Sequence, residues 1–148
     1  MSSHPRRRLS ASNLAPVASS LISHITGGGI AANLARVLPK NTTLDVDRST
    51  WRPADVFQVL TSWANLDLTQ VESTWNLGLG FAVSVKADKT QEIQQQLNST
   101  GINTWQLGLV ESTDCSLEGY IQGPKGVEGG AVRLGRNAHS GRFVLYYR

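Results

Sequence analysis

Short strand-like and helix-like patterns alternate along residues 21–109, and this alternation limits the possible folds more than any other feature of the chain. Apolar residues within 30–38 recur at helical spacing, whereas those within 43–47 alternate with polar neighbours, as in a half-buried strand. The same two patterns repeat further along the chain. Such alternation predicts a mixed α/β (α+β) layered structure, in which helices pack on a sheet of about four strands.

The expected elements follow from the positions of apolar, Gly and Pro residues. Strands are predicted over 21–26, 43–47, 81–85 and 105–109, and helices over 30–38, from Pro53 onward and over 90–98, with a further short helix within 66–75. Val56, Leu60 and Trp63 share one face of the helix that begins near Pro53. The four tryptophans, at 51, 63, 75 and 105, fall at element edges and on helix faces, which favours core or interface roles for them.

Three segments differ in composition. Residues 1–20 form a basic N-terminal segment, residues 21–111 carry the periodic patterns, and residues 112–148 are glycine-rich and predict a loop or an extended tail. Residues 131–134 and 143–147 could add edge strands there. Arg6–Arg8 and the Ser-rich stretch after them resemble a twin-arginine signal or a transit peptide in composition. Pro16 interrupts the apolar part of that stretch and favours a soluble basic end instead.

Charge and cysteine content exclude several function classes. The net charge is +3, but residues 21–112 hold six basic and eight acidic residues, so the positive balance comes from the two ends. We therefore expect no nucleic-acid partner. Cys115 is the one cysteine, which excludes an internal disulfide and fits a reducing, cytoplasmic location. The three histidines lack metal-ligand spacing, and no run of about 18 apolar residues predicts a membrane helix.

The best candidate for chemistry is the segment from His24 to Ile30, where three glycines lie between a strand and a helix. Glycines can adopt positive φ and direct successive backbone N–H groups at one point, and the helix N-terminus adds its own N–H groups. Thr26 could add a hydroxyl, and His24 could bind phosphate or transfer a proton. The motif is neither the Walker A loop, which needs Lys-Ser/Thr after the last glycine, nor the spaced dinucleotide-binding fingerprint. Two structural alternatives therefore remain: glycines that merely turn the chain, and a histidine with a structural role.

The second candidate is the segment Asn76–Gly80, in which two glycines stand two residues apart at the entrance to a strand. Glycines in this position let a ligand or another backbone approach closely, and a β-bulge is the alternative. We find no Ser/His/Asp triad and expect no metal site in the chain itself.

In this order, the segment from His24 to Gly29, the helix through Asn33–Pro39 and the segment Thr74–Gly80 resemble the C-terminal domain of AIR synthetase, the phosphoribosylformylglycinamidine cyclo-ligase of purine biosynthesis. The resemblance covers roughly residues 21–111. It raises the phosphate-binding interpretation of the glycine loop above what the motif alone supports, and it implies some ferredoxin-like character in the fold.

The resemblance implies a function. Enzymes of this family use ATP and Mg²⁺ to activate the formyl oxygen of a phosphorylated ribonucleotide, which then closes to an imidazole ring. By this likeness, Thr26 and the glycines at 27, 28 and 29 would bind phosphate, His24 would lie near the reacting centre, and Asn76 would position substrate or brace the loop. The full-length family proteins are homodimers, whose N-terminal domain binds ATP and carries the main dimer interface.

The chain departs from that family by lacking any segment that resembles the ATP-binding domain. We therefore expect a substrate-binding domain that is inactive alone: a truncated gene product, an excised domain or a subunit of a split enzyme. In the last case a separate ATP-binding domain or chain is the expected partner. Two other interpretations remain. One is a non-catalytic anion-binding or interaction module with the same fold. The other is a related ATP-dependent enzyme: the synthase that makes formylglycinamidine ribonucleotide, selenophosphate synthetase or thiamine-monophosphate kinase.

Overall fold

The computed structural model describes residues 19–112, 116–122, 129–135 and 142–147. The predictions for the basic N-terminal segment and for Cys115 lie outside these residues. Within the described part of the chain, no helix is long and apolar enough to cross a membrane.

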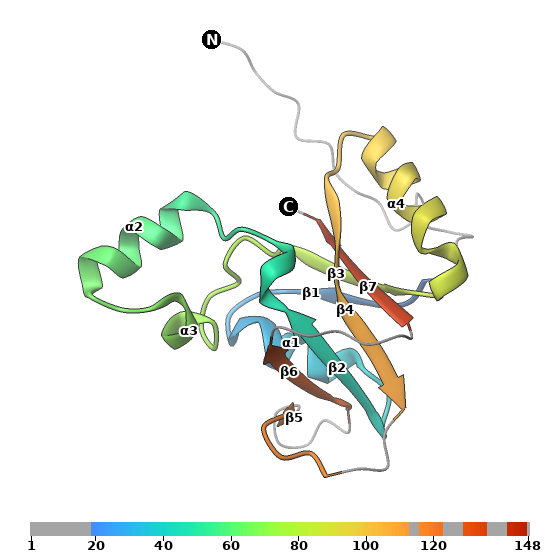
Figure 1. Ribbon diagram of the computed structural model, residues 1–148, viewed down its shortest axis with the longest axis horizontal. Coiled ribbons are helices and arrows are strands. Elements are labelled where there is room, and N and C mark those ends of the chain that lie inside the picture. The colour runs from blue at the N-terminus through green and yellow to red at the C-terminus, as the bar shows by residue number, and fades with distance from the viewer. Residues whose placement is uncertain (1–18, 113–115, 123–128, 136–141, 148) are drawn as a thin grey trace.

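All eight expected elements are present, with small changes in their bounds. The strands are β1 (Ser19–His24), β2 (Thr42–Asp47), β3 (Phe81–Val85) and β4 (Thr104–Ser112). The helices are α1 (Gly29–Val37), α2 (Asp55–Ala64), α3 (Leu68–Val71) and α4 (Thr90–Ser99), and the short 3₁₀ turns η2 (Arg48–Thr50) and η3 (Ala87–Lys89) follow β2 and precede α4. The mixed α/β architecture is therefore confirmed (Figure 1).

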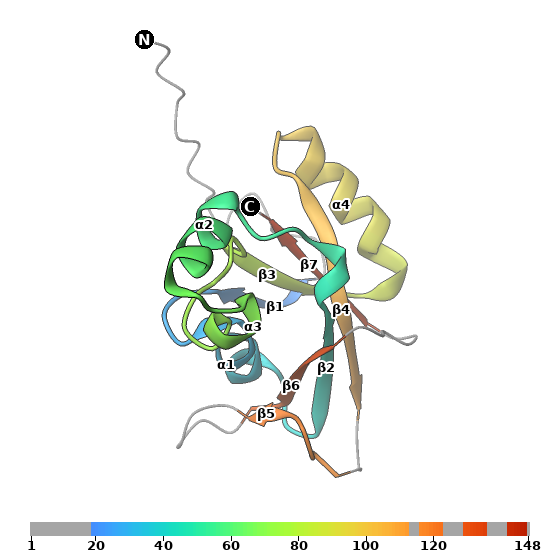
Figure 2. The ribbon, with the colours of Figure 1, turned by 60° about the vertical axis from the view of Figure 1, so that its left-hand side comes forward.

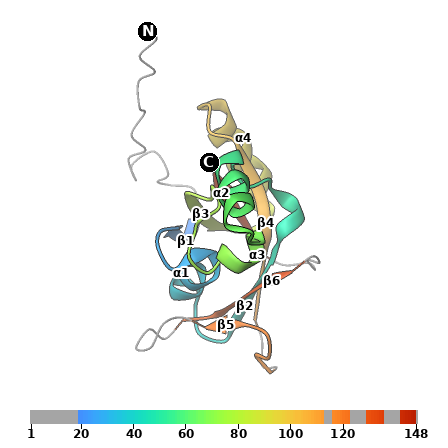
Figure 3. The same cartoon turned by 90° about the vertical axis from the view of Figure 1, so that its left-hand side faces the viewer.

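Three more strands widen the sheet: β5 (Ile121–Gln122), β6 (Ala131–Gly135) and β7 (Arg142–Tyr147). The strand order is β1-β3-β7-β4-β2-β6-β5. Neighbouring strands are antiparallel except for β2 and β6, which are parallel. Figure 3 shows β5 and β6 beside β2 at the bottom of the view.

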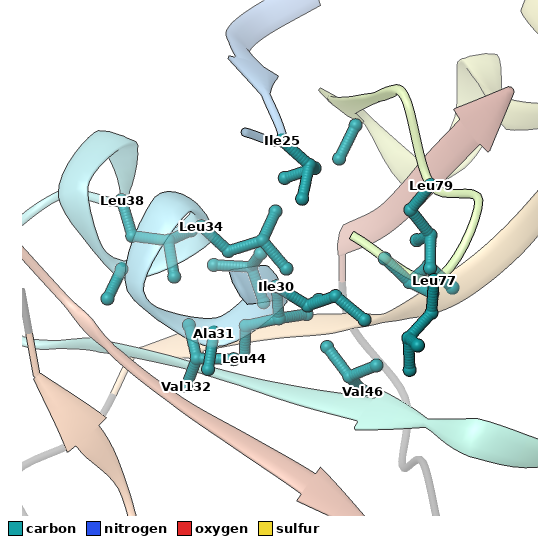
Figure 4. Close-up of a cluster of buried hydrophobic side chains, with 14 of the residues drawn as sticks. Ile25, Ile30, Ala31, Leu34, Leu38, Leu44, Val46, Leu77, Leu79 and Val132 are labelled. Carbon is teal, nitrogen blue, oxygen red and sulfur yellow. The ribbon is translucent and has the colours of Figure 1, made fainter. Parts of the chain in front are cut away.

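Helices cover both faces of the sheet, as the turned view of Figure 2 shows for α1 and α4. In β3, Ala82 belongs to the main core together with residues of α1. Val83 and Val85 instead form a smaller cluster with Ile93 of α4. Because successive strand residues point to opposite faces, α1 and α4 lie on opposite sides of β3. The main core lies on the α1 side and joins β1, β2 and the loop before β3 (Figure 4).

The prediction that residues 112–148 form a tail outside the domain is wrong for the described part of that segment. β6 lies between β2 and β5, and β7 lies between β3 and β4, so neither is an edge strand. The glycines that suggested a tail instead permit close packing. A Cβ at Gly129 would overlap the carbonyl oxygen of Ala35 in α1, and the N–H of Gly130 donates to the carbonyl oxygen of Leu38 at 3.0 Å.

Polar contacts also attach this C-terminal segment to β2. Asp45 accepts from Arg133 Nε at 2.8 Å and from the Tyr120 hydroxyl at 3.1 Å, and the Arg133 guanidinium lies 4.7 Å from the centre of the Tyr120 ring. Burial, together with the carboxylate of Asp45, raises the pKa of Tyr120. Residues 120 and 133 therefore belong to the folded body of the protein.

The helix pair α2–α3 lies beyond the ends of the strands, at the left of Figure 1. Phe57 of α2 packs on Trp75, with ring centres 5.5 Å apart. Trp51, Trp75 and Trp105 pack against the main core, as predicted, whereas Trp63 is exposed on α2.

Candidate functional site

The loop between β1 and α1 is organised by the buried side chain of Asn33. Its Nδ2 donates to the carbonyl oxygens of Thr26 and Gly27, both at 3.3 Å, and to that of Gly29 at 2.7 Å. Its Oδ1 accepts from the Thr26 hydroxyl at 3.4 Å. One amide from the helix therefore fixes the three carbonyl groups of the glycine loop.

The structure explains the presence of glycine at two of the three positions of this loop, each for a different reason. Gly28, the N-cap of α1, has φ +96° and Gly29 has φ +77°, values that a residue with a Cβ adopts only at a cost. Gly29 is also buried, and a Cβ there would overlap the backbone of Glu72 and Ser73. A Cβ at Gly27 would meet nothing within 4 Å. Conformation thus requires Gly28, close packing also requires Gly29, and neither explains Gly27.

The carbonyl directions determine where the loop N–H groups point. Across a planar trans peptide, the carbonyl oxygen and the following N–H point in opposite directions. Since Asn33 binds the carbonyl groups of Thr26 and Gly27, the N–H groups of Gly27 and Gly28 point away from it. The N–H of Ile30 instead donates to the carbonyl oxygen of Glu72 at 3.2 Å. The outward N–H pair at Gly27 and Gly28 is the part of the loop that is suited to an anion.

The second sequence block lies against the first. Asn76 Nδ2 donates to the carbonyl oxygen of Ile25 at 3.5 Å, and its Oδ1 accepts from the N–H of Gly78 at 3.1 Å. The N–H of Ile25 in turn donates to Gly80 at 2.9 Å. Leu77 has φ +51° and is buried in the same core as Ile25 and Ile30 (Figure 4). Asn76 therefore braces the turn before β3 against the end of β1.

His24 is a predicted site residue, but its side chain lies on the face of the sheet opposite α1. The hydroxyl of Ser23, the residue before it, donates to the backbone of Asn33 at 2.9 Å, so Ser23 faces α1. By strand alternation, His24 faces the other side of the sheet. There its imidazole stacks on Phe81, its partner across the strands, with ring centres 4.4 Å apart and an angle of 11° between the planes. The backbone of His24 leads into the loop, but its ring is directed away from α1.

An ion pair supports the far side of the loop. Glu72, whose carbonyl binds Ile30, accepts from Arg48 Nε at 2.9 Å and also from the Nη2 of that residue. Arg48 Nη1 donates to the carbonyl oxygen of Leu134 at 2.7 Å. The hydrogen bond to Glu72 raises the pKa of the Arg48 guanidinium. This pair connects the loop to the end of β2 and to β6.

Sequence reasoning missed Asn33, Glu72 and Arg48 as supports of the loop. Asn33 could have been found from the sequence, because it is a polar residue three positions after Ile30 on the apolar face of the predicted helix. A buried amide at such a position requires hydrogen-bond partners. Glu72 and Arg48 could not have been found in this way, because they are 24 residues apart and meet only through the fold.

The groove between α2 and α3 does not overlap with the predicted site. A groove of about 650 Å³ between α2 and α3 is lined by residues of 58–69 and by none of the predicted site residues. Among the described residues, no group of three or more His, Cys, Asp or Glu side chains comes together as a metal site would require.

A family model described as "AIR synthase related protein, C-terminal domain" matches residues 8–118. The chain belongs to this family. The match includes β1, the glycine loop, α1 and the turn around Asn76, and it extends on both sides of the predicted domain at 21–111. The AIR synthase-related domain therefore contains both blocks that meet at Ile25.

Proposed function

We propose that this AIR synthase-related domain binds the phosphorylated ribonucleotide substrate of an ATP-dependent cyclo-ligase of purine biosynthesis. The observation that carries the proposal is the loop held by Asn33, which directs the N–H groups of Gly27 and Gly28 outward. Backbone N–H groups held in advance stabilise anions without rearranging when the ligand binds.

Each site residue receives a role in this proposal. Gly27 and Gly28 bind phosphate through their N–H groups, and the Thr26 hydroxyl binds a further phosphate oxygen when it turns its single hydrogen from Asn33 Oδ1 to the ligand. Gly29 allows the loop to pack on Glu72. Asn76 braces the loop from the other block. His24 remains the candidate catalytic residue, and it requires a substrate that reaches the Phe81 side of β1.

ATP and Mg²⁺ belong to the proposed reaction but not to this domain. Mg²⁺ prefers carboxylate and phosphate oxygens, and the described residues bring no cluster of acidic side chains together. We propose that a separate ATP-binding domain or chain supplies both, in the cytoplasm, and that this chain alone is inactive. Turnover of substrate and ATP by the purified chain at about 10 s⁻¹, a typical enzyme rate, would contradict this division.

The alternative is a non-catalytic anion-binding or interaction module. It is favoured by the orientation of His24, whose imidazole stacks on Phe81 on the side of the sheet opposite α1. In such a module the loop would still bind phosphate, but a His24→Ala variant would leave the activity of any reconstituted complex unchanged.

The decisive variant is Gly27→Ala, because a Cβ at this position meets no protein atom within 4 Å. Isothermal titration with ribose 5-phosphate should show affinity reduced about tenfold, a loss of about 1.4 kcal/mol, with an unchanged melting temperature. Thr26→Val should cost about 0.5–1.5 kcal/mol of binding free energy. Gly29→Ala is the matched control, since it should lower the melting temperature. Unchanged affinity in the folded Gly27 and Thr26 variants would remove the site from this loop.

A further inference from the structure

Arg36 lies in the last turn of α1, but its guanidinium reaches back toward the glycine loop. Its Nη2 donates to Asn33 Oδ1 at 3.3 Å. The same oxygen accepts from the Thr26 hydroxyl at 3.4 Å. The end of the Arg36 side chain and the Thr26 hydroxyl therefore meet at one atom, on the Thr26 side of the loop.

The position of Arg36 at the helix end does not explain this orientation. A basic residue in the last turn usually complements the negative end of the helix dipole and binds the last carbonyl groups. The guanidinium of Arg36 instead contacts a side chain one turn closer to the N-terminus of α1. Helical side chains lean toward the N-terminus, and a long arginine side chain extends in that direction. The orientation of Arg36 therefore relates it to the loop rather than to the end of the helix.

Within the described part of the chain, no carboxylate neutralises the positive charge of Arg36. The sequence has no acidic residue before Asp45, so neither the loop nor α1 carries a carboxylate. Arg36 is exposed, and its bond to Asn33 uses one of the five N–H groups of the guanidinium. A full charge and several donors therefore remain for a ligand. The ion pairs between described side chains are Arg48–Glu72, Arg52–Asp55, Lys89–Glu92 and Arg133–Asp45.

Arg36 also keeps the buried amide of Asn33 hydrogen-bonded while phosphate is bound. The Thr26 hydroxyl has a single hydrogen, so Asn33 Oδ1 loses this donor when the hydroxyl turns to a ligand. A buried oxygen left without a donor would oppose binding. Arg36 Nη2 still donates to that oxygen, so Asn33 keeps its orientation. The carbonyl groups of Thr26, Gly27 and Gly29 then stay in place, and with them the outward N–H groups.

We propose that Arg36 is a further phosphate-binding residue of this site and supplies its positive charge. The inference rests on the proposed function, because it concerns the ligand of the same loop. Backbone N–H groups and a hydroxyl carry no net charge, whereas a phosphate monoester carries about −1.5 to −2 at pH 7. A guanidinium offers several N–H groups in one plane, a geometry that matches phosphate oxygens. With Nη2 on Asn33, the other N–H groups of Arg36 donate to the phosphate beside the oxygen that Thr26 binds.

The test is isothermal titration of the full chain with ribose 5-phosphate at low and at physiological ionic strength. Arg36→Gln keeps a donor for Asn33 but removes the charge, and it should reduce the affinity at least about tenfold. Salt should weaken binding to the wild type, because it screens the charge, and should weaken binding to Arg36→Gln less. Arg36→Lys should recover part of the affinity and the salt dependence of the wild type. Melting temperatures should stay unchanged, since Arg36 is exposed.

Arg52→Gln is the matched control, because it removes the same charge from an exposed position just before α2. It should bind like the wild type. If Arg36→Gln also bound like the wild type while Gly27→Ala bound weakly, the role of Arg36 would be overturned and the proposed function would stand. Equal losses in Arg36→Gln and Arg36→Lys would likewise overturn it, since charge would not be what matters. A wild type that does not bind ribose 5-phosphate, or unchanged affinity in Gly27→Ala, would overturn the proposed function and this inference with it.

Discussion

Helices α1 and α2 share an apolar spacing but have different surroundings. Ile30, Leu34 and Val37 of α1 stand at the same intervals as Val56, Leu60 and Trp63 of α2. In α1 these residues face the sheet and Leu34 is 2% exposed, whereas in α2 they face outward and Leu60 is 38% exposed. The spacing shows which side of a helix is apolar, but it does not show whether the same chain covers that side.

The difference arises from what surrounds each helix. α1 follows β1 directly and is enclosed by β1 on one side and by the strands β5 and β6 on another. The loop that precedes it is held by its own Asn33. α2 follows a 3₁₀ turn at the end of β2 and extends beyond the sheet, where Trp75 and α3 are its main support (Figure 1).

The same substitution at Leu34 and at Leu60 tests whether the two helices differ in how firmly they are packed. Leu34→Ala should lower the free energy of unfolding by about 2–5 kcal/mol, because it leaves a cavity in the main core. Leu60→Ala should lower it by less than about 1 kcal/mol, because part of that side chain is already in water. Urea unfolding of dilute protein measures both. Equal losses would show that α2 is as firmly packed as α1.

A second test concerns the loop at the start of α1. Asn33→Ala should lower the free energy of unfolding by about 1–3 kcal/mol, since it removes the donor to the buried carbonyl group of Gly29. Asn98→Ala is the control, because the side chain of Asn98 is exposed and accepts hydrogen bonds from the N–H and the hydroxyl of Thr104. It should cost less than about 1 kcal/mol. A cost at Asn33 no larger than at Asn98 would mean that the loop does not depend on the amide.

The sequence predicted the elements within 21–109 because their apolar residues are periodic and Gly or Pro residues separate them. It did not predict that β7 lies inside the sheet, because a strand pattern alone does not select its neighbours. The glycines at 129 and 130 misled for a related reason. They lie in a segment without periodicity. The close approach of α1 to Gly129, and of Thr42 and Leu38 to Gly130, exists only in the folded protein.

The candidate site was predicted in part. Both sequence blocks were identified, and the fold brings them together at Ile25. The direction of the His24 ring was not predictable, because it depends on which face of β1 meets α1. The sequence predicted a loop of N–H groups, but not that those of Gly27 and Gly28 are the pair directed outward, since this follows from a hydrogen-bonded amide six or seven residues away.

The smallest expected effect compares the ends of the two helices. α1 ends at Leu38 in an extended conformation, whereas α2 ends at Asn65 in the left-handed region, with φ +53°. Asn65→Ala should cost about 1 kcal/mol of stability, because an L residue with an ordinary Cβ is strained there. Asn65→Gly should change stability by less than about 0.5 kcal/mol, since glycine adopts this conformation freely but loses more chain entropy on folding. Urea unfolding of the two variants separates these outcomes. If both variants lost the same stability, the side-chain contacts of Asn65 rather than its backbone conformation would be what ends α2.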